Sequence, residues 1–152
     1  MVEVRTFACY IPNAPWGNHE RFIVAHTAGK AKVQYWNHVN DAWPDIPYTA
    51  VRVRTCKGSI VQTKEFRHTA AYRGLTFARL GMKVQCGNEK NGTWNGVIVG
   101  SNSSANFDVL FSDGPHAGVT LNCHPLWMMK YYAEDGTLIY DSEAVKTKGT
   151  EC

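Results

Sequence analysis

The chain has few of the features that mark secreted, membrane-spanning or metal-dependent proteins. Its five cysteines are scattered singly, with no CxxC pair, and their odd number argues against a secreted disulfide framework. No apolar run is long enough to cross a bilayer, and the first residues lack the basic and apolar succession of a signal peptide. We therefore expect a cytoplasmic protein with reduced thiols, no metal, no cofactor and no membrane partner.

The chain also has little excess of positive over negative charge. The 152 residues carry 16 Lys and Arg against 13 Asp and Glu, a net charge of +3. A nucleic-acid-binding protein usually has a much denser basic surface, so this composition does not favour the class of nucleic-acid-binding proteins. A local basic patch is compatible with it, and nucleic-acid binding stays an alternative. The composition is otherwise that of an ordinary globular protein, with room for one domain or two small ones.

The first half of the chain predicts a small α+β unit. Residues 21–25 form a compact apolar strand candidate, and Thr27 can cap a helix whose apolar residues recur at spacings of three and four. A second strand candidate at 49–56 alternates apolar and basic residues. Strand, helix and strand within about 35 residues predict a βαβ unit with parallel strands. Residues 65–72 show a modest helical pattern, and residues 1–20, which contain two prolines, predict an irregular arm.

The second half predicts a small β-barrel or half-barrel. Alternating apolar and polar residues indicate short strands at 82–86, 94–99, 106–111, 118–121, 129–132 and 137–140. The whole chain is therefore expected to be α+β, with an N-terminal β-α-β unit packed on a C-terminal barrel. We place the N-terminal unit at 1–76, the barrel at 77–141 and a flexible tail at 142–152.

Three segments of the second half carry a resemblance to a known class of barrel. They are GVIVG at 96–100, FDVLFSDG at 107–114 and NCHPLW at 122–127. Together they resemble Src-homology-3-like, or KOW-like, barrels over roughly residues 78 to 141. The resemblance implies a module that binds proteins, peptides or nucleic acid.

The chain as a whole resembles uncharacterised small proteins encoded by bacteriophages and prophages. The segments that carry this second resemblance are FIVA at 22–25, AGKA at 28–31, VRVR at 51–54, GSNSSAN at 100–106 and NCHP at 122–125. It implies a phage accessory protein that works in the host cytoplasm by binding a host defence protein, a signalling nucleotide or nucleic acid. Fold and origin supply only an analogy for function.

Five tryptophans and one polar loop are the leading candidates for a binding surface. Trp36 and Trp43 are seven residues apart on one helix and are expected in the core. Trp94 and Trp127 are flanked by turn residues, and we expect them to be exposed and to bind. The loop at 100–106 offers hydrogen-bonding side chains at Asn102, Ser103 and Asn106, and we expect it to converge with the two tryptophans into one recognition edge. The same residues also make a good hairpin loop for purely local reasons.

Basic residues of the first half form the second candidate surface. Lys30 follows Thr27 at a strand-to-helix turn, where backbone N–H groups favour an anion, although the spacing is not that of a P-loop. Arg52 and Arg54 share one side of the predicted strand. An ordinary helix start and a solvated strand face are the simpler interpretations. In the nucleic-acid alternative these three residues and Arg73 would contact phosphates while Trp94 and Trp127 stack on bases.

Cysteine and histidine offer the remaining chemistry. Cys123 and His124, with Cys86 and His116, form the one candidate metal or thiol cluster, but neighbours along a strand point to opposite faces. A hydrolase that uses Cys123 or His124 is therefore the third hypothesis. Our leading interpretation is a non-enzymatic phage-encoded binding protein with a counter-defence role, whose partner is a host protein or a nucleotide.

Overall fold

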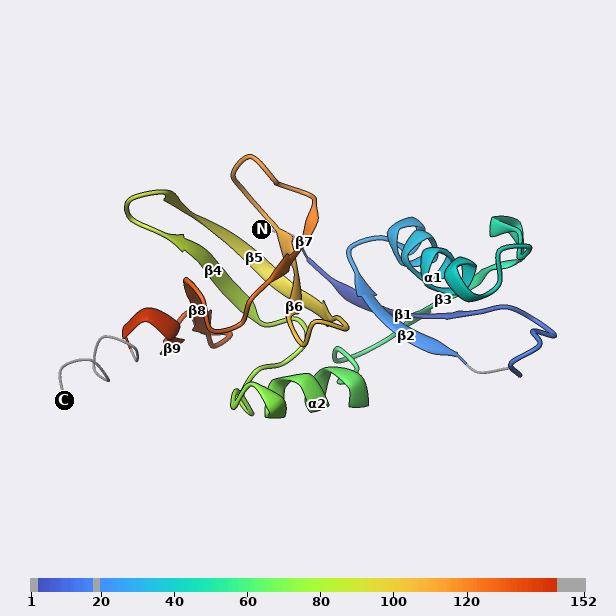
Figure 1. Cartoon of the computed structure of the whole chain (residues 1–152), viewed down its shortest axis with the longest axis horizontal. Helices are drawn as coiled ribbons and strands as arrows, with labels where there is room; N and C mark the ends of the chain where they lie inside the picture. The colour runs from blue at the N-terminus through green and yellow to red at the C-terminus, as the bar shows by residue number, and fades with distance from the viewer. Residues whose placement is uncertain (1–2, 18–19, 145–152) are drawn as a thin grey trace. The chain divides into compact units, whose positions relative to one another are not determined.

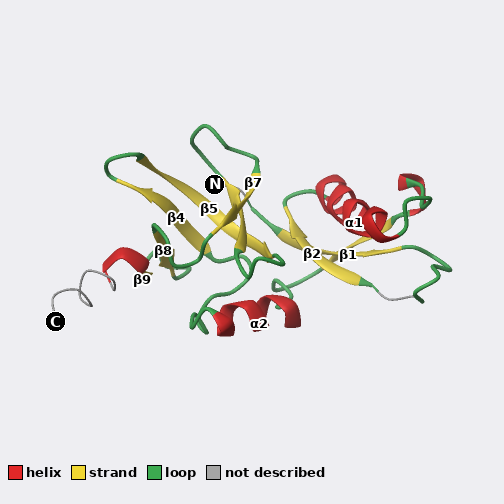
Figure 2. Ribbon diagram, in the orientation of Figure 1, coloured by secondary structure: helices red, strands yellow, loops and turns green. Residues whose placement is uncertain are grey.

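A computed structural model describes residues 3–17 and 20–144 (Figure 1). The chain divides into two compact units between Val61 and Gln62, whereas the sequence analysis placed a boundary after residue 76. We call residues 3–61 the N-terminal unit and residues 62–144 the C-terminal unit. Helices and two antiparallel sheets, of three and six strands, confirm a mixed α+β architecture (Figure 2).

The N-terminal unit is a three-stranded sheet with one helix. Strands β1 (Arg5–Tyr10), β2 (Arg21–Ala25) and β3 (Arg52–Cys56) lie in the order β2-β1-β3, and both outer strands are antiparallel to β1. Helix α1 (Ala28–Ala42) connects β2 to β3, and a short 3-10 helix, η1 (Tyr48–Ala50), precedes β3. The expected strand, helix and strand are therefore present, and β2 and β3 run parallel to each other because both are antiparallel to β1. They are not neighbours in the sheet, because β1 lies between them.

Strand β1 was missed because it lies in the segment expected to be an irregular arm. Its prolines come only after the strand has ended, at residue 12 and beyond, so they do not interrupt the hydrogen-bond ladder. Phe7 and Cys9 on β1 pack against Ala31, Tyr35 and Val39, which form the buried stripe of α1 at intervals of four residues. This burial outweighs the local turn signals that follow the strand.

The tryptophans of α1 flank this core rather than form it. Trp36 is half-buried and its indole nitrogen donates to the carbonyl of Ile46 at 3.1 Å. Trp43 is 44% exposed and lies against Trp16, with ring centroids 5.5 Å apart. Trp43 is the C-cap residue of α1 and has a non-helical backbone, so it lies just beyond the helix that was expected to carry both residues.

The C-terminal unit is one six-stranded antiparallel sheet with a short helix, α2 (Lys64–Tyr72). The strands lie in the order β7-β6-β5-β4-β8-β9. All the strands expected in this half are present; the one at 129–132 has the expected bounds, and the others have shifted ends. Their bounds are β4 (Lys83–Asn88), β5 (Gly92–Ser101), β6 (Phe107–Phe111), β7 (Thr120–Cys123), β8 (Met129–Tyr132) and β9 (Leu138–Asp141).

A barrel or half-barrel was expected here, and the sheet does not close into a barrel. Within the described residues, β7 and β9 are unpaired edges. The sheet is nevertheless strongly curled. The evidence is that the thiols of Cys86 on β4 and Cys123 on β7 are hydrogen-bonded. Two strands separate β4 from β7, so a flat sheet would hold them roughly 14 Å apart. The inside of the curl is the core of the unit.

Aromatic side chains fill the part of this core that lies near α2. Phe66 on α2 packs against Phe107 with ring centroids 4.9 Å apart, and Phe107 meets Tyr131 at 6.4 Å. The Tyr131 hydroxyl donates to the carbonyl of Pro125 at 2.6 Å. Phe107 pairs with Ser101, which is the last residue of β5. Aromatic side chains therefore fill the inner face of the sheet at the Ser101 end of β5, opposite the Gly92 end. The other end is the one that holds the candidate site.

The described chain continues past the expected end of the barrel. Ser142 is buried, and its hydroxyl accepts from the backbone N–H of Met129 at 3.1 Å. Glu143 accepts from the N–H of Met128 at 2.9 Å. These two residues of the expected tail therefore hold the start of β8, and residues 145–152 lie outside the described part.

Candidate binding site

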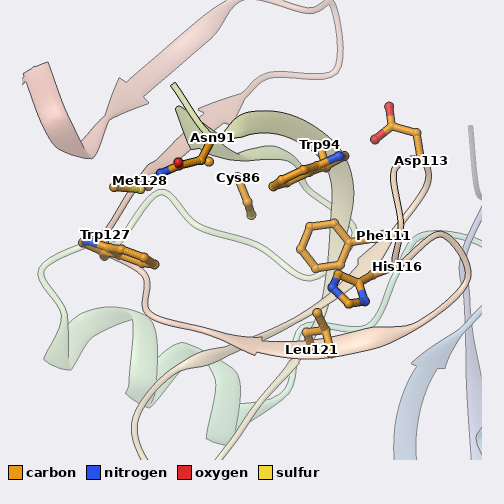
Figure 3. A pocket seen from close by; sticks show the side chains of 10 residues that line it. Cys86, Asn91, Trp94, Phe111, Asp113, His116, Leu121, Trp127 and Met128 are labelled. Carbon is orange, nitrogen blue, oxygen red and sulfur yellow. The ribbon is translucent and has the colours of Figure 1, made fainter. Parts of the chain in front are cut away.

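An apolar pocket of about 240 Å³ opens at the Gly92 end of the curled sheet (Figure 3). Trp94 and Trp127 lie on opposite sides of it, and the side chain of Cys86 projects between them. The pocket is lined by Cys86, Gly87, Asn91, Trp94, Phe111, Asp113, His116, Leu121, Trp127 and Met128.

The lining comes from four strands and from the segments that connect β4 to β5, β6 to β7 and β7 to β8. Cys86 on β4 is the direct cross-strand partner of Trp94 on β5, so both side chains project from the same face. Phe111 ends β6, and Leu121 lies in β7. Because these strands curl around one another, residues as far apart in the sequence as Cys86 and Met128 reach the same cavity. A period-2 pattern alone would show the shared face but not the cavity.

Two glycines hold Trp94 in place. Gly92 and Gly114 both have positive φ, at 95° and 77°, which favours glycine. A Cβ atom built on Gly92 would lie 3.0 Å from Cζ2 of Trp94, and one built on Gly114 would overlap the five-membered part of the indole. The indole of Trp94 therefore packs directly against the backbone at both glycines, which fixes one wall of the pocket.

Trp127 forms the opposite, open wall. Its side chain is 60% exposed, so it contributes apolar surface that the fold itself does not bury. The adjacent Met128 has φ +50°, an uncommon conformation for a non-glycine residue. The backbone there is held from both sides: the Met128 carbonyl accepts from the N–H of Gly87 at 2.9 Å, and the Met128 N–H donates to Glu143. The geometry of this wall is thus imposed by tertiary contacts.

The pocket lining carries little charge. Asp113 stands at the outer rim, and its two carboxylate oxygens accept from the backbone N–H and side-chain amide of Asn95, at 2.8 and 2.9 Å. The hydrogen bond with Cys123, together with burial, raises the pKa of the Cys86 thiol, so this thiol is neutral at pH 7. No lysine or arginine is among the lining residues.

Two members of the cysteine and histidine cluster, Cys86 and His116, are among the residues that line the pocket. Cys123 contacts Cys86, and this hydrogen bond lowers the pKa of Cys123 while burial opposes the shift. The Nδ1 atom of His124 accepts from the N–H of Leu126 at 3.1 Å. In the described ranges, no group of three or more His, Cys, Asp or Glu residues could hold a metal ion.

The polar loop at 100–106 lies away from the pocket. It begins at the opposite end of β5 from Trp94, eight residues and about 26 Å along the strand from Trp94 to Asn102. The Asn102 side chain donates to Asp108 at 2.8 Å, and the Asn106 side chain donates to Asn122 at 2.9 Å. Ser103 is exposed. The structure thus brings the two tryptophans together but does not bring the loop to them.

Arg73 is part of this loop's support. Its guanidinium donates to the carbonyls of Ser104 and Ala105 and to the side chain of Asn106, at 3.3, 2.8 and 3.0 Å. These contacts give it a structural role in holding the loop.

The candidate basic residues Lys30, Arg52 and Arg54 belong to the N-terminal unit, and the two tryptophans to the C-terminal unit. Arg54 forms an ion pair with Glu20 at 2.8 Å, and Arg52 donates to the carbonyl of Thr49 at 2.9 Å. Lys30 is exposed in the first turn of α1, where its backbone N–H donates to the capping Thr27 hydroxyl at 3.1 Å. This is the ordinary helix start that was the simpler interpretation.

Several lining residues were missed by the sequence analysis, namely Asn91, Phe111, Asp113, Leu121 and Met128. The alternation at 107–111 indicated that Phe111 lies on the apolar face of its strand, and this was the available signal. Leu121 lies in β7, and its place in the lining depends on the pairing of β7 with β6. The others come from turns, where no periodicity applies.

No protein-family model, curated protein or solved structure matches this chain. None of the helices in the described part is long and apolar enough to cross a membrane. Function is therefore inferred from the site itself.

Proposed function

We propose that this chain is a non-enzymatic binding protein whose pocket, between Trp94 and Trp127, receives one apolar group of a partner. The observation that supports this proposal is an apolar cavity with an exposed tryptophan as one wall. Tryptophan is enriched among residues that dominate binding energy, and an indole that is not buried by its own fold can be buried by a partner. Convergent apolar side chains with a few polar groups at the rim are typical of ligand sites.

The size of the cavity limits what it holds. A dry cavity of about 150 Å³ is enough for benzene, and pockets for drug-sized ligands span roughly 300 to 1,000 Å³. The volume of about 240 Å³ therefore suits one ring or one branched alkyl group. A nucleotide is a poorer fit, because its phosphates would find no lysine or arginine in the lining. Of the two partner classes expected for a phage accessory protein, the pocket favours a protein over a nucleotide; the counter-defence role itself stays a prediction.

The test uses a small neutral probe, 3,3-dimethylbutan-1-ol, which carries a branched alkyl group of suitable size. Titration is followed by NMR of the indole N–H resonances, assigned with single tryptophan variants. We expect the Trp94 and Trp127 resonances to move, and Trp127→Ala to abolish the response. Trp43→Ala is the matched control, because Trp43 is also an exposed tryptophan but belongs to the N-terminal unit. Equal responses in the two variants would refute the proposed site.

A further inference from the structure

The pocket combines aromatic rings with a bias toward positive ligands. Trp94 and Trp127 lie on opposite sides, and the buried Phe111 adds a third ring. The face of an aromatic ring carries partial negative charge and attracts cations, most strongly in tryptophan. Rings of this kind also accept neutral apolar groups, so the charges around them decide which ligand class is favoured.

The formal charge of the pocket lining is negative. Asp113 is the one lining residue that carries a formal charge at pH 7, counting histidine as neutral. Asn95 holds both of its oxygens, so the carboxylate is fixed at the rim rather than free to turn away. Lys90 is close in sequence, next to Asn91 in the β4–β5 turn, but it is not part of the lining. An anion would therefore find no lysine or arginine in the lining and would be repelled by the Asp113 carboxylate. An organic cation would be attracted by the carboxylate and by the rings.

We propose that the pocket binds an alkylated ammonium group. This inference rests on the proposed function and names its ligand class. A trimethylammonium group has nearly the size and shape of a tert-butyl group, so it satisfies the volume limit equally well. It differs in its positive charge, which is spread over the methyl groups and is weakly hydrated, so an indole can attract it without a large desolvation cost. Asp113 adds attraction from the rim.

Such a group can come from a free small molecule or from a methylated lysine side chain of a protein. The chemistry at the pocket is the same, and probes of the two kinds separate the sources. Choline represents the free cation. A short peptide with trimethyl-lysine, compared with the same peptide carrying unmodified lysine, represents the protein side chain.

The decisive comparison is choline against 3,3-dimethylbutan-1-ol, its uncharged carbon analogue, measured by the same indole resonances at low and high salt. We expect choline to bind about tenfold more tightly, in line with cation–π attraction at a partly desolvated site. Asp113→Asn should weaken choline binding two- to threefold, more at low salt, because a charge at the rim acts through solvent. The neutral alcohol should be insensitive to that change and to salt. Glu134→Gln, an exposed acid outside the lining, is the matched control and should alter neither ligand.

A second variant separates aromatic attraction from apolar contact. Trp127→Leu keeps apolar surface on the open wall but removes the indole, so choline should lose most of its advantage over the alcohol. Because Trp127 is 60% exposed, this variant should fold normally, which its melting temperature verifies. Trp43→Leu should retain the full preference.

The outcomes separate the two proposals. Equal binding of choline and the alcohol would overturn the cation proposal and leave the apolar pocket intact. Binding of neither would overturn both. A preference for choline that survives Trp127→Leu unchanged would place the cation elsewhere and overturn this site. If the trimethyl-lysine peptide binds more tightly than the unmodified peptide, the source is a protein; a response to choline alone indicates a free small molecule.

Discussion

The thiols of Cys86 and Cys123 are hydrogen-bonded across the inside of the C-terminal sheet, although β4 and β7 are separated by two strands. This contact shows that the sheet is strongly curled. It also lies at the pocket, because Cys86 is part of the lining. Cys86 and Trp94 are cross-strand partners, so the curl that joins the two cysteines also shapes the wall formed by Trp94.

The first prediction is that mild oxidation links these two cysteines. Diamide should accept two electrons and two protons from the thiols, forming one disulfide and reduced diamide. The mass should fall by about 2 Da, and unreduced peptide mapping should identify the Cys86–Cys123 pair. Closing a loop of about 40 residues should stabilise the folded state by roughly 3 to 4 kcal/mol if the geometry is unstrained.

Cys86→Ser and Cys123→Ser should each block this mass change, and Cys56→Ser should not. A disulfide that forms instead between other cysteines of the monomer would contradict the contact.

The second prediction separates backbone strain from the packing of Trp94. Gly114→Ala adds a methyl group that overlaps the indole, whereas Gly118→Ala meets nothing within 4 Å; both positions have positive φ, at 77° and 82°. Gly118→Ala should cost about 1 kcal/mol of unfolding free energy from φ alone. Gly114→Ala should cost about 2 kcal/mol more, because the indole must move.

Chemical denaturation measures both variants, and the Trp94 indole resonance reports the displacement directly. Equal losses of stability would mean that Gly114 serves only the turn.

The third prediction concerns the two tryptophans of the pocket, which should behave differently when truncated. Trp127→Ala should leave the melting temperature within about 2 °C of wild type, since surface substitutions rarely exceed ~0.5 kcal/mol. It should cost about 2 kcal/mol or more of binding to a partner. Trp94→Ala should lower the melting temperature, because this half-buried indole packs against Gly92 and Gly114. Thermal unfolding measured beside binding separates the effects. A large loss of stability in Trp127→Ala would show that this residue belongs to the fold.

The fourth prediction is a loss of stability at alkaline pH through Cys9. Burial, with a smaller contribution from Cys56, raises the pKa of Cys9 from 9.0 to about 11. The folded state holds the thiol proton more tightly than the unfolded state does, so the contribution is fully present below pH 9 and is lost as the pH rises toward 11. The total is about 2 to 3 kcal/mol. Denaturation of wild type and Cys9→Ala from pH 8 to 10.5 should show a steeper decline for wild type; parallel curves would contradict it.

The local features of this protein could be predicted from its sequence because their causes are local. Thr27 caps α1, and the alternation of apolar and polar residues shows where the strands of the second half lie. The exposure of Trp127, in a segment of turn residues, belongs to this class too.

Strand pairing and the pocket were decided by tertiary structure. A period of two says which side chains share a face of a strand, but it does not say which strand lies next to it. The place of β1 between β2 and β3, and the curl that brings Cys86 to Cys123, therefore had no sequence signal. The pocket requires both the curl and the close packing of Trp94 against Gly92 and Gly114, which depend on contacts between distant parts of the chain. The sequence by itself determined the strands of the second half, the helix cap and the exposed tryptophan. Only the tertiary structure turned them into a cavity, because a cavity is a relation among several strands and not a property of any one of them.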